Sequence, residues 1–155
     1  MGKALDLYDK EEFYSCLQCA VCTGGCPTAR VVPGYNPREI ILKYILYGEQ
    51  DDVLEMPVLW ACTTCHTCQE RCPNEICISG LLTHILNLAA KRGNMPKTLR
   101  EAIKLIAETG WSVQATAHSD RVRGELGLKP LKRPNTDEIK QIFREAGLDE
   151  ILDLK

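Results

Sequence analysis

The sequence predicts an all-α, or mainly α, chain, and three observations support this fold class. Apolar residues recur at helical spacing in the segments 37–47, 78–92, 96–109 and 137–146. A glycine follows each segment, where it can end a helix. Two cysteine-rich loops interrupt the helical pattern between residues 16 and 73. A chain of 155 residues with this pattern fits one helical domain with an appended segment.

The bulk composition indicates a globular protein. Hydrophobic residues make up 45% and charged residues 26% of the chain, as in ordinary soluble domains. The acidic N-terminal segment has no continuous apolar stretch and is unlike a secretory signal. The apolar stretches are far shorter than the ~20 residues that a membrane-spanning helix needs. We therefore expect a cytoplasmic protein without a membrane span of its own.

Charge and cysteine divide the chain into two unlike halves. Residues 1–78 contain 6 Lys/Arg and 11 Asp/Glu, a balance of −5, and they hold all nine cysteines. Residues 79–155 contain 13 Lys/Arg and 10 Asp/Glu, a balance of +3. Because the basic half mixes both signs, we expect no nucleic-acid partner.

The cysteines form two runs with one rhythm. The first run, CLQCAVCTGGCP, covers residues 16–27, and the second run, CTTCHTCQERCP, covers residues 62–73. A disulfide framework fits poorly, because the count is odd and a cytoplasmic compartment is reducing. Structural zinc needs two pairs of ligands and requires neither a third cysteine nor the proline. The spacing C-x₂-C-x₂-C-x₃-C-P is instead that of bacterial ferredoxins and predicts two [4Fe–4S] clusters.

The spacing also predicts which cysteines share a cluster. Three closely spaced cysteines bind one cluster, and the fourth cysteine of each run reaches the neighbouring cluster. The first cysteine set, which binds one cluster, is therefore Cys16, Cys19, Cys22 and Cys72. The second cysteine set, which binds the other, is Cys62, Cys65, Cys68 and Cys26.

Some residues near the runs are candidates for supporting roles. Pro27 and Pro73 fix φ and turn the chain after each crossing ligand. Gly24 and Gly25 allow a positive φ or a close approach, so that their amides face cluster sulfides, or they form a plain turn.

Four other side chains are expected to have ordinary structural roles rather than to bind a cofactor. Cys77 belongs to neither run, and we expect a small buried hydrophobe, with a redox role as the alternative. His66 is expected to be an ordinary loop residue, although it could donate to a sulfide. His84 is expected to be a packed or surface residue rather than a ligand. Trp60 is expected to pack in the core, or else to shield a cluster from water.

The insert between the runs predicts an α-helical ferredoxin core. Asn36 is a candidate N-cap, with Pro37 at the first helical position, Glu39 at the third and Gly48 as the stop. A second short helix is expected from Val58 into the second run. Helical inserts of this kind differ from the β-hairpins that join the runs of small clostridial-type ferredoxins.

The rest of the chain predicts further helices. Segment 78–92 has a long apolar stripe, and segment 96–110 is expected to face inward through Leu99, Ile103, Leu105 and Ile106, so that both helices close over the clusters. Segment 111–135 lacks clear periodicity and is expected to be a basic loop, either solvated or used for docking. Thr136 is expected to cap a helix over 137–146 with Ile139, Ile142 and Phe143 on one stripe. The tail 148–154 could pack on another chain.

These patterns divide the chain into residues 1–95, the cluster-binding core, and residues 96–155, a helical extension and partner-docking segment. No dinucleotide fingerprint, P-loop or nucleophile–base constellation is visible, so no catalytic residue is expected. Two clusters without a substrate site indicate a protein that conducts single electrons.

Three segments together resemble one family of iron–sulfur proteins. They are the two cysteine runs, Asn36-Pro-Arg-Glu-Ile in the insert, and Trp60-Ala-Cys-Thr-Thr-Cys. With them the chain resembles the C subunit of the heterodisulfide reductases of methanogens and their relatives, from about Tyr14 to Leu131. The runs alone also occur in the iron–sulfur subunits of glycolate oxidase and in related respiratory modules.

The resemblance implies the electron-transfer subunit of a soluble, three-part heterodisulfide reductase complex. A flavin-bearing A subunit, through which a hydrogenase or formate dehydrogenase can act, would bifurcate electrons. The C subunit would relay them through its two [4Fe–4S] clusters. The B subunit, with CCG domains, would reduce the heterodisulfide of coenzyme M and coenzyme B. The chain has no Cys-Cys-Gly, which implies an oxidoreductase subunit without an active site of its own.

Two other functions stay open on the sequence alone. One is a relay subunit of a related sulfur-metabolism or glycolate-oxidase-like redox complex with another terminal acceptor. The other, from a different class, is a zinc-binding interaction module without a redox role.

Overall fold

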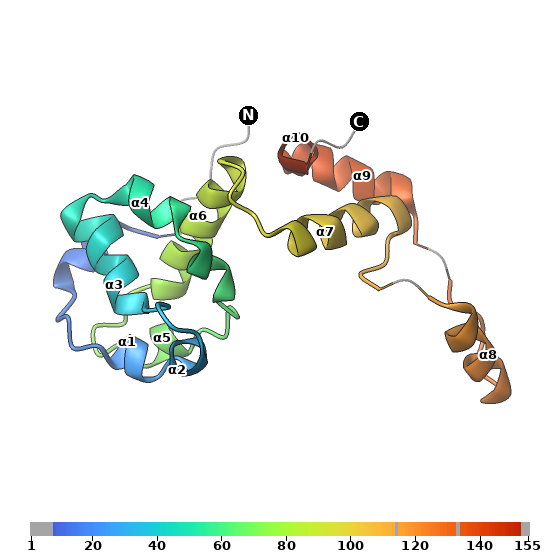
Figure 1. The fold of residues 1–155 in the computed structure, drawn as a ribbon, viewed down its shortest axis with the longest axis horizontal. Coiled ribbons are helices and arrows are strands. Elements are labelled where there is room, and N and C mark those ends of the chain that lie inside the picture. The colour runs from blue at the N-terminus through green and yellow to red at the C-terminus, as the bar shows by residue number, and fades with distance from the viewer. Residues whose placement is uncertain (1–7, 114, 133, 153–155) are drawn as a thin grey trace. The chain divides into compact units, whose positions relative to one another are not determined.

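The computed structural model describes residues 8–113, 115–132 and 134–152. All regular structure in these ranges is helical (Figure 1), which confirms the all-α fold class. The chain divides between Met95 and Pro96 into two compact units. In the described ranges, no helix has both the length and the hydropathy that a membrane crossing requires.

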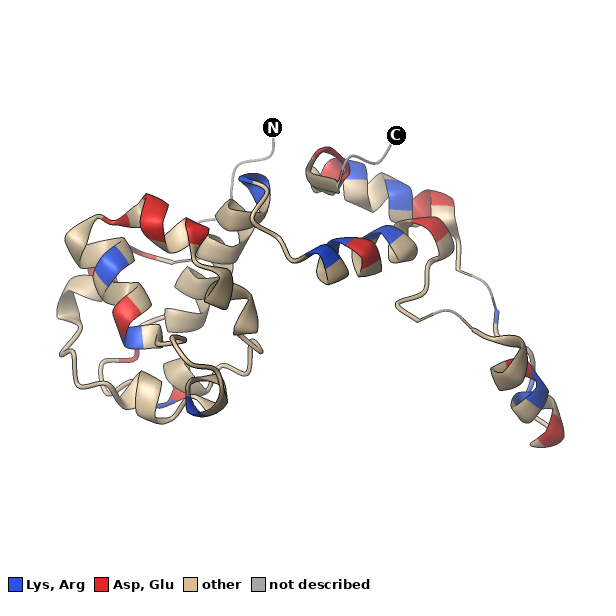
Figure 2. Cartoon of the chain, viewed as in Figure 1, with Lys and Arg blue, Asp and Glu red and all other residues tan. Residues whose placement is uncertain are grey.

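The N-terminal unit consists of short helices around one long helix. In chain order these are η1 (Glu11–Ser15), α1 (Val21–Gly24), α2 (Pro27–Val31), α3 (Pro37–Ile41), the π-helix η2 (Leu42–Tyr47), α4 (Gln50–Glu55), η3 (Pro57–Ala61), α5 (Thr67–Glu70) and α6 (Ile78–Lys91). The helix α6 agrees with the predicted segment 78–92. Acidic residues gather along α4 (Figure 2), in keeping with the negative balance of this half.

The insert between the runs starts and ends as the sequence predicts. The Oδ1 atom of Asn36 accepts a hydrogen bond from the backbone N–H of Glu39 at 3.2 Å, and Pro37 opens α3. Gly48 ends η2 with a φ of 73°. The widening from α3 to the π-helix η2 was not predicted, because the apolar spacing of this segment suits either kind of helix.

The core of the N-terminal unit lies between the insert, α4 and α6. Burial of each large apolar side chain stabilises the fold by roughly 1.5–3 kcal/mol. The ring of His84 packs edge-on against the rings of Tyr8 and Tyr44, with centroids 5.0 and 6.5 Å apart, so the prediction of a packed histidine is confirmed. The main buried residues are Phe13, Tyr35, Ile40, Ile41, Tyr44, Ile45, Val53, Leu54, Leu59, Ile76, Ile78, Leu81, Leu82, Ile85 and Ala89.

The segment before the second run differs from the expectation of one short helix from Val58. Two helices occur there: α4, which the sequence analysis missed, and the 3₁₀-helix η3, which Pro57 opens. Trp60 packs against the core as predicted, and its Nε1–H donates to the backbone oxygen of Asn94 at 2.6 Å. The Nδ2 atom of Asn94 donates to the backbone oxygen of Leu54 at 2.6 Å, which ties the end of α6 to α4.

The C-terminal unit contains α7 (Lys97–Thr109), α8 (Ala117–Glu125), α9 (Thr136–Glu145) and α10 (Leu148–Leu152). The expectation that 111–135 is a loop is wrong, because α8 lies within it. Thr116 and Ser119 form a capping box, with a hydrogen bond from the Ser119 N–H to Thr116 Oγ1 at 3.1 Å. Helix α9 starts one residue earlier than predicted, and Asn135 rather than Thr136 caps it.

Two residues of the predicted apolar stripes of this unit are exposed. Leu99 on α7 is 38% exposed and Ile142 on α9 is 61% exposed, whereas Ala107 is the buried residue of α7. In the tail, Leu152 is fully buried and the backbone oxygen of Ile151 accepts a hydrogen bond from Arg100 at 2.7 Å. The described tail therefore packs within its own unit; residues 153–155, and Arg133 of the basic segment, lie outside the described residues.

Candidate iron–sulfur site

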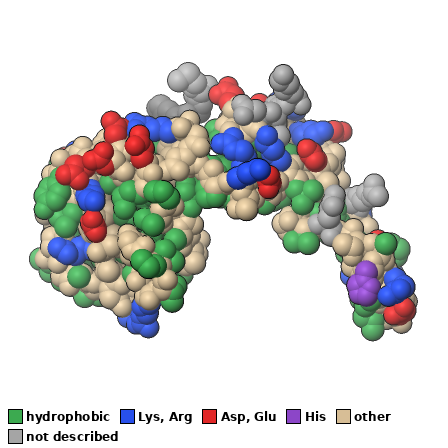
Figure 3. All heavy atoms as spheres, in the orientation of Figure 1, with side chains coloured by type: hydrophobic (Ala, Val, Ile, Leu, Met, Phe, Trp, Pro, Cys, Tyr) green, Lys and Arg blue, Asp and Glu red, His purple; other side chains and the backbone are tan. Residues whose placement is uncertain are grey.

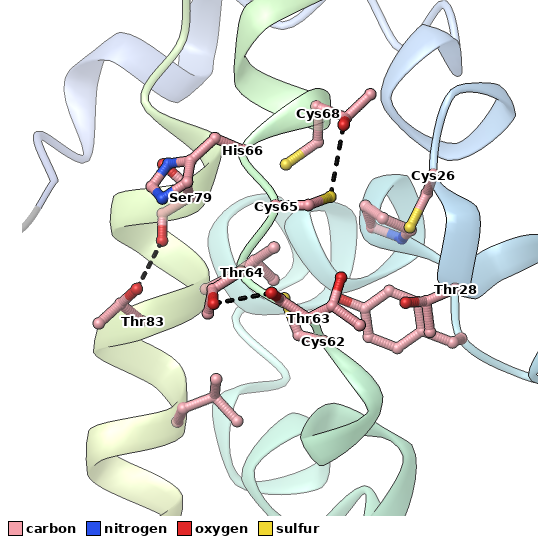
Figure 4. Close-up of a pocket in the computed structure, with 15 residues that line it drawn as sticks. Cys26, Thr28, Cys62, Thr63, Thr64, Cys65, His66, Cys68, Ser79 and Thr83 are labelled. Carbon is pink, nitrogen blue, oxygen red and sulfur yellow. Dashed lines mark hydrogen bonds between the residues drawn. The ribbon is translucent and has the colours of Figure 1, made fainter. Parts of the chain in front are cut away.

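The eight cysteines of the two runs line two separate cavities in the N-terminal unit. The first cavity is lined by the first cysteine set, Cys16, Cys19, Cys22 and Cys72. The second cavity is lined by the second cysteine set, Cys26, Cys62, Cys65 and Cys68. In Figure 4 the labelled cysteine side chains of the second cavity come from α5, from the loop before it and from the start of α2. Each cavity thus combines three cysteines of one run with the last cysteine of the other.

The two runs place their cysteines with the same local backbone. A 3₁₀-helix precedes each run, η1 or η3, and a short α-helix lies within it, α1 or α5. Two non-glycine residues of each run have positive φ at equivalent positions. These are Gln18 (54°) and Ala20 (62°) in the first run and Thr64 (50°) and His66 (60°) in the second. Such residues cost of order 1 kcal/mol or more each and persist only where their surroundings fix them.

The expectation of positive φ at Gly24 or Gly25 is wrong. Gly25 has a φ of −85°, and neither glycine is among the positive-φ residues of the described chain. The left-handed turns fall between the first three cysteines of each run instead, where the loop curls around its cavity. A close approach does occur at Gly25, where a Cβ atom would lie 2.9 Å from the Cδ atom of Arg71.

Two hydrogen bonds join the runs beside the crossing cysteines. The Oγ1 atom of Thr28, two residues after Cys26, donates to the backbone oxygen of Ala61, which precedes Cys62, at 3.2 Å. The Nδ2 atom of Asn74, two residues after Cys72, donates to the backbone oxygen of Ser15, which precedes Cys16, at 2.5 Å. The sequence analysis missed these residues.

A signal for Thr28 and Asn74 was nevertheless present in the sequence. Each residue directly follows a Cys-Pro pair and carries a side-chain donor. The repeated position shows that both crossings are held in the same way, by a bond from one run to the residue before the other.

Burial differs most within the second cysteine set, whereas the first set has three half-buried cysteines and one exposed cysteine. Cys26 and Cys68 are buried, whereas Cys19 and Cys65 are exposed. Burial raises the pKa of the Cys68 thiol to about 11, and burial also raises the pKa of Cys22. Hydrogen bonding from Thr67 lowers the pKa of the exposed Cys65. Each cavity therefore has one cysteine at the molecular surface, at equivalent positions of the two runs.

The walls of the second cavity are rich in hydroxyl groups. Thr28, Thr63, Thr64, Thr67, Ser79, Thr83 and Tyr35 contribute to its lining. Tyr35 is only 3% exposed, and burial together with a hydrogen bond to Cys62 raises the pKa of its hydroxyl. The hydroxyl therefore stays protonated and can donate to the Cys62 sulfur. His66 is exposed at the rim of this cavity, and Cys77 is half-buried and lines neither cavity.

The donor sets fit an iron–sulfur cluster better than a single ion. Zinc draws four ligands to within about 2.3 Å of one centre. Within the described ranges, no three His, Cys, Asp or Glu side chains converge closely enough to hold one metal ion. Each set of four cysteines instead surrounds a cavity, as is required when each thiolate binds a different iron of a [4Fe–4S] cluster.

Comparisons with known proteins agree with this geometry. Residues 12–76, which include both runs, match the family model of the 4Fe-4S dicluster domain. The chain is 34% identical over 145 residues to the second iron-sulfur C subunit of the CoB–CoM heterodisulfide reductase of Methanocaldococcus jannaschii, covering 89% of this chain and 76% of that protein. The chain belongs to the heterodisulfide reductase C-subunit family.

Two further relatives support the same assignment. The C subunit of the ferredoxin:CoB-CoM heterodisulfide reductase of Methanosarcina mazei is 37% identical over 143 residues, which cover 88% of this chain and 87% of that protein. The C subunit of the H(2):CoB-CoM heterodisulfide,ferredoxin reductase of Methanothermobacter thermautotrophicus is 35% identical over 144 residues, 88% of this chain and 76% of that one.

Membership in the heterodisulfide reductase C-subunit family confirms the cofactor predicted from the cysteine spacing. The chain binds two [4Fe–4S] clusters, and it is an iron–sulfur subunit of an oxidoreductase family. The alternatives of zinc and of a disulfide framework are accordingly set aside.

Proposed function

We propose that each cysteine set holds one [4Fe–4S] cluster, with the fourth ligand of each cluster supplied by the other run. The lining of the two cavities supports this assignment, because each contains one complete set. The hydrogen bonds of Thr28 and Asn74 support it as well, since they hold the runs together beside the two crossing cysteines. When bound, each cluster accepts and releases single electrons.

The chain serves as the electron-transfer subunit of a heterodisulfide reductase complex. It lies between a flavin-bearing A subunit, which supplies electrons, and a catalytic B subunit that reduces the heterodisulfide of coenzyme M and coenzyme B. The observation that carries this function is the exposure of one cysteine in each set, Cys19 in the first and Cys65 in the second. Each cavity can therefore be approached by a different partner protein, one as electron donor and one as acceptor.

Residues 1–95 form the cluster-binding core of this relay, and residues 96–155 dock a partner. The C-terminal unit exposes apolar side chains that a folded monomer would normally cover, among them Val113 at 76% and Leu126 at 68%. Figure 3 shows hydrophobic and basic side chains together at the α8 end. No carboxylate within the described ranges lies within 4 Å of the Lys129 or Lys132 amines. An acidic and apolar surface on a partner protein complements this region.

Copurification under strict anaerobiosis tests the docking assignment. The double variant Lys129→Glu, Lys132→Glu is expected to copurify with at least tenfold less partner protein than the wild-type chain, while its iron content is unchanged. Ile142→Asp, on an exposed face of α9, is the control and is expected to retain the partner. Equal recovery with all three chains would show that docking takes place elsewhere.

Stopped-flow oxidation tests the relay. The reduced chain alone is expected not to react with the heterodisulfide, but to be reoxidised when the B subunit is added. Reaction of the isolated chain with the heterodisulfide would contradict the relay function. If copurification instead brings down proteins with another terminal acceptor, the chain is a relay of a related sulfur-metabolism complex.

A further inference from the structure

One side chain breaks the symmetry between the two runs. At equivalent positions, Gln18 and Thr64 share the same left-handed backbone, with φ of 54° and 50°. The Nε2 atom of Gln18 donates to the Sγ atom of Cys16 at 3.2 Å. The hydroxyl of Thr64 instead donates to the neighbouring backbone oxygen of Thr63 at 2.8 Å. The first cavity therefore has an amide donor on a cysteine sulfur where the second has none from the equivalent residue.

Arg38 fixes which end of the Gln18 amide faces the sulfur. The Nε atom of Arg38 donates to the Oε1 atom of Gln18 at 3.2 Å. A guanidinium group has donors and no acceptor, so the amide oxygen must face Arg38. The amide nitrogen is then turned towards Cys16. The three groups form a chain of hydrogen bonds that points from a positive charge to a cysteine sulfur.

The position of Arg38 is itself tied to the first run. Its backbone N–H donates to the Oγ1 atom of Thr23 at 3.1 Å, and Thr23 directly follows Cys22. The Thr23 hydroxyl donates in turn to the Oδ1 atom of Asn36, the N-cap of α3, at 2.7 Å. The start of α3 is therefore locked against the loop that carries three cysteines of the first set.

Arg38 lines only the first of the two cavities. The described lining of the second cavity contains neither lysine nor arginine. Within the described residues, no carboxylate lies within 4 Å of the Arg38 guanidinium. A nearby positive charge and N–H···S hydrogen bonds both favour the more negative, reduced state of a cluster.

We propose that Arg38, acting through Gln18, raises the reduction potential of the cluster held by the first cysteine set. This proposal rests on the crossed ligand sets given above. The added electron is stabilised at the first set, so that this pair of residues contributes to the direction of transfer through the chain. Arg38 and Gln18 are positioning residues, because they bind neither iron nor substrate.

An EPR-monitored redox titration of the full chain, purified anaerobically, tests the proposal. In Arg38→Gln, one of the two one-electron steps is expected to move to a more negative potential. The ratio of reduced to oxidised cluster at a fixed potential should fall threefold to tenfold, where tenfold corresponds to about 59 mV for one electron. The other step should move by clearly less, because Arg38 does not line the second cavity. The step that moves should belong to the signal that Cys72→Ser alters.

Two further variants separate the charge from the hydrogen bond. Gln18→Leu removes the bond to Cys16 and is expected to shift the same step in the same direction. Combining it with Arg38→Gln should give less than the sum of the two shifts, because both act along one path. Lys43→Gln is the matched control, since Lys43 carries the same charge on the same insert, pairs with Glu39 at 2.9 Å and lines neither cavity.

The outcomes distinguish a failure of the cluster assignment from a failure of the tuning role of Arg38 and Gln18. A wild-type chain with far fewer than about eight irons would overturn the cluster assignment itself. Full iron content with both steps unmoved in Arg38→Gln and Gln18→Leu would overturn the tuning role alone. Should Arg38→Gln lose iron, Gln18→Leu and Arg38→Lys decide the matter. At full iron content, a negative shift of the potential in Gln18→Leu and a smaller negative shift in Arg38→Lys support the proposal. If neither variant shifts the potential, the proposal is wrong.

Discussion

At the residue scale, the second cysteine set combines thiols of opposite character. Cys65 is exposed and its pKa is lowered by hydrogen bonding from Thr67, whereas burial raises the pKa of Cys68 to about 11. Because only the thiolate reacts, iodoacetamide at pH 8 should modify Cys65 at least tenfold faster than Cys68 in the cluster-free chain. With rising pH the Cys65 rate should reach half its maximum below pH 9, while the Cys68 rate should reach half its maximum near pH 11.

Mass spectrometry of quenched samples measures both rates. The comparison requires that the cluster-free chain keep its helical circular dichroism, since unfolded thiols react alike. Equal rates in a helical chain would contradict the burial and hydrogen bonding described for this set.

The role of Thr28 in holding the two runs together can be tested by a single substitution. Thr28→Val leaves the backbone oxygen of Ala61 without its bond beside Cys26 and Cys62, at a cost of about 1–2 kcal/mol. Chelator-induced iron loss should therefore accelerate for the cluster of the second set and stay unchanged for the other. Thr64→Val is the control, because that hydroxyl bonds only to the adjacent Thr63. If both variants lose iron at the wild-type rate, the bond from Thr28 does not hold the crossing.

Residue-scale detail was only partly predictable from the sequence. The spacing of the runs predicts two groups of cysteines, and the residues of each group line one cavity. The positive φ of Gln18 and Ala20 was missed, because these residue types normally avoid that region and adopt it here only under the constraint of the loop. The bond from Arg38 to Gln18 joins two distant segments, which no local pattern reveals.

At the element scale, the end of α7 depends on one glycine. Gly110 has a φ of 74°, and a Cβ atom there would lie 2.6 Å from the Cγ atom of Pro134. Gly110→Ala should destabilise the C-terminal unit by about 2–4 kcal/mol, from the strained backbone and the overlap together. Gly127→Ala is the matched control, since it has a φ of 68° and open space, and should cost only about 1 kcal/mol.

Far-UV circular dichroism during urea unfolding measures this difference. A Gly110→Ala chain as stable as Gly127→Ala would show that Pro134 does not pack closely against the end of α7.

Elements with strong end signals were predictable, and those without were not. Asn36 and Gly48 bound the insert where expected, and Gly93 and Gly110 follow α6 and α7. Helix α8 escaped prediction because it is largely polar and because Ser119, rather than a glutamate or glutamine, completes its capping box. Helix α4 escaped because six residues are too few to display a period.

At the scale of the whole molecule, the two units differ in the side chains that they carry. The N-terminal unit holds both cysteine-lined cavities, and the C-terminal unit exposes apolar and basic side chains. In the sequence, charge and cysteine content differ between residues 1–78 and residues 79–155, a boundary that lies before the one between the units. The exposure of Leu99 and Ile142 could not be predicted, because a periodic apolar stripe does not show how much of each residue its own unit covers.

The crossed ligation of two [4Fe–4S] clusters is the claim on which the proposed relay depends. The most direct test is the EPR spectrum of the reduced Cys26→Ser chain, compared with those of Cys22→Ser and Cys68→Ser. We predict that Cys26→Ser alters the same signal as Cys68→Ser, although Cys26 lies in the run of Cys22, and leaves the signal that Cys22→Ser alters intact. If Cys26→Ser instead affects the signal that depends on Cys22, each run binds its own cluster and the crossed arrangement is wrong.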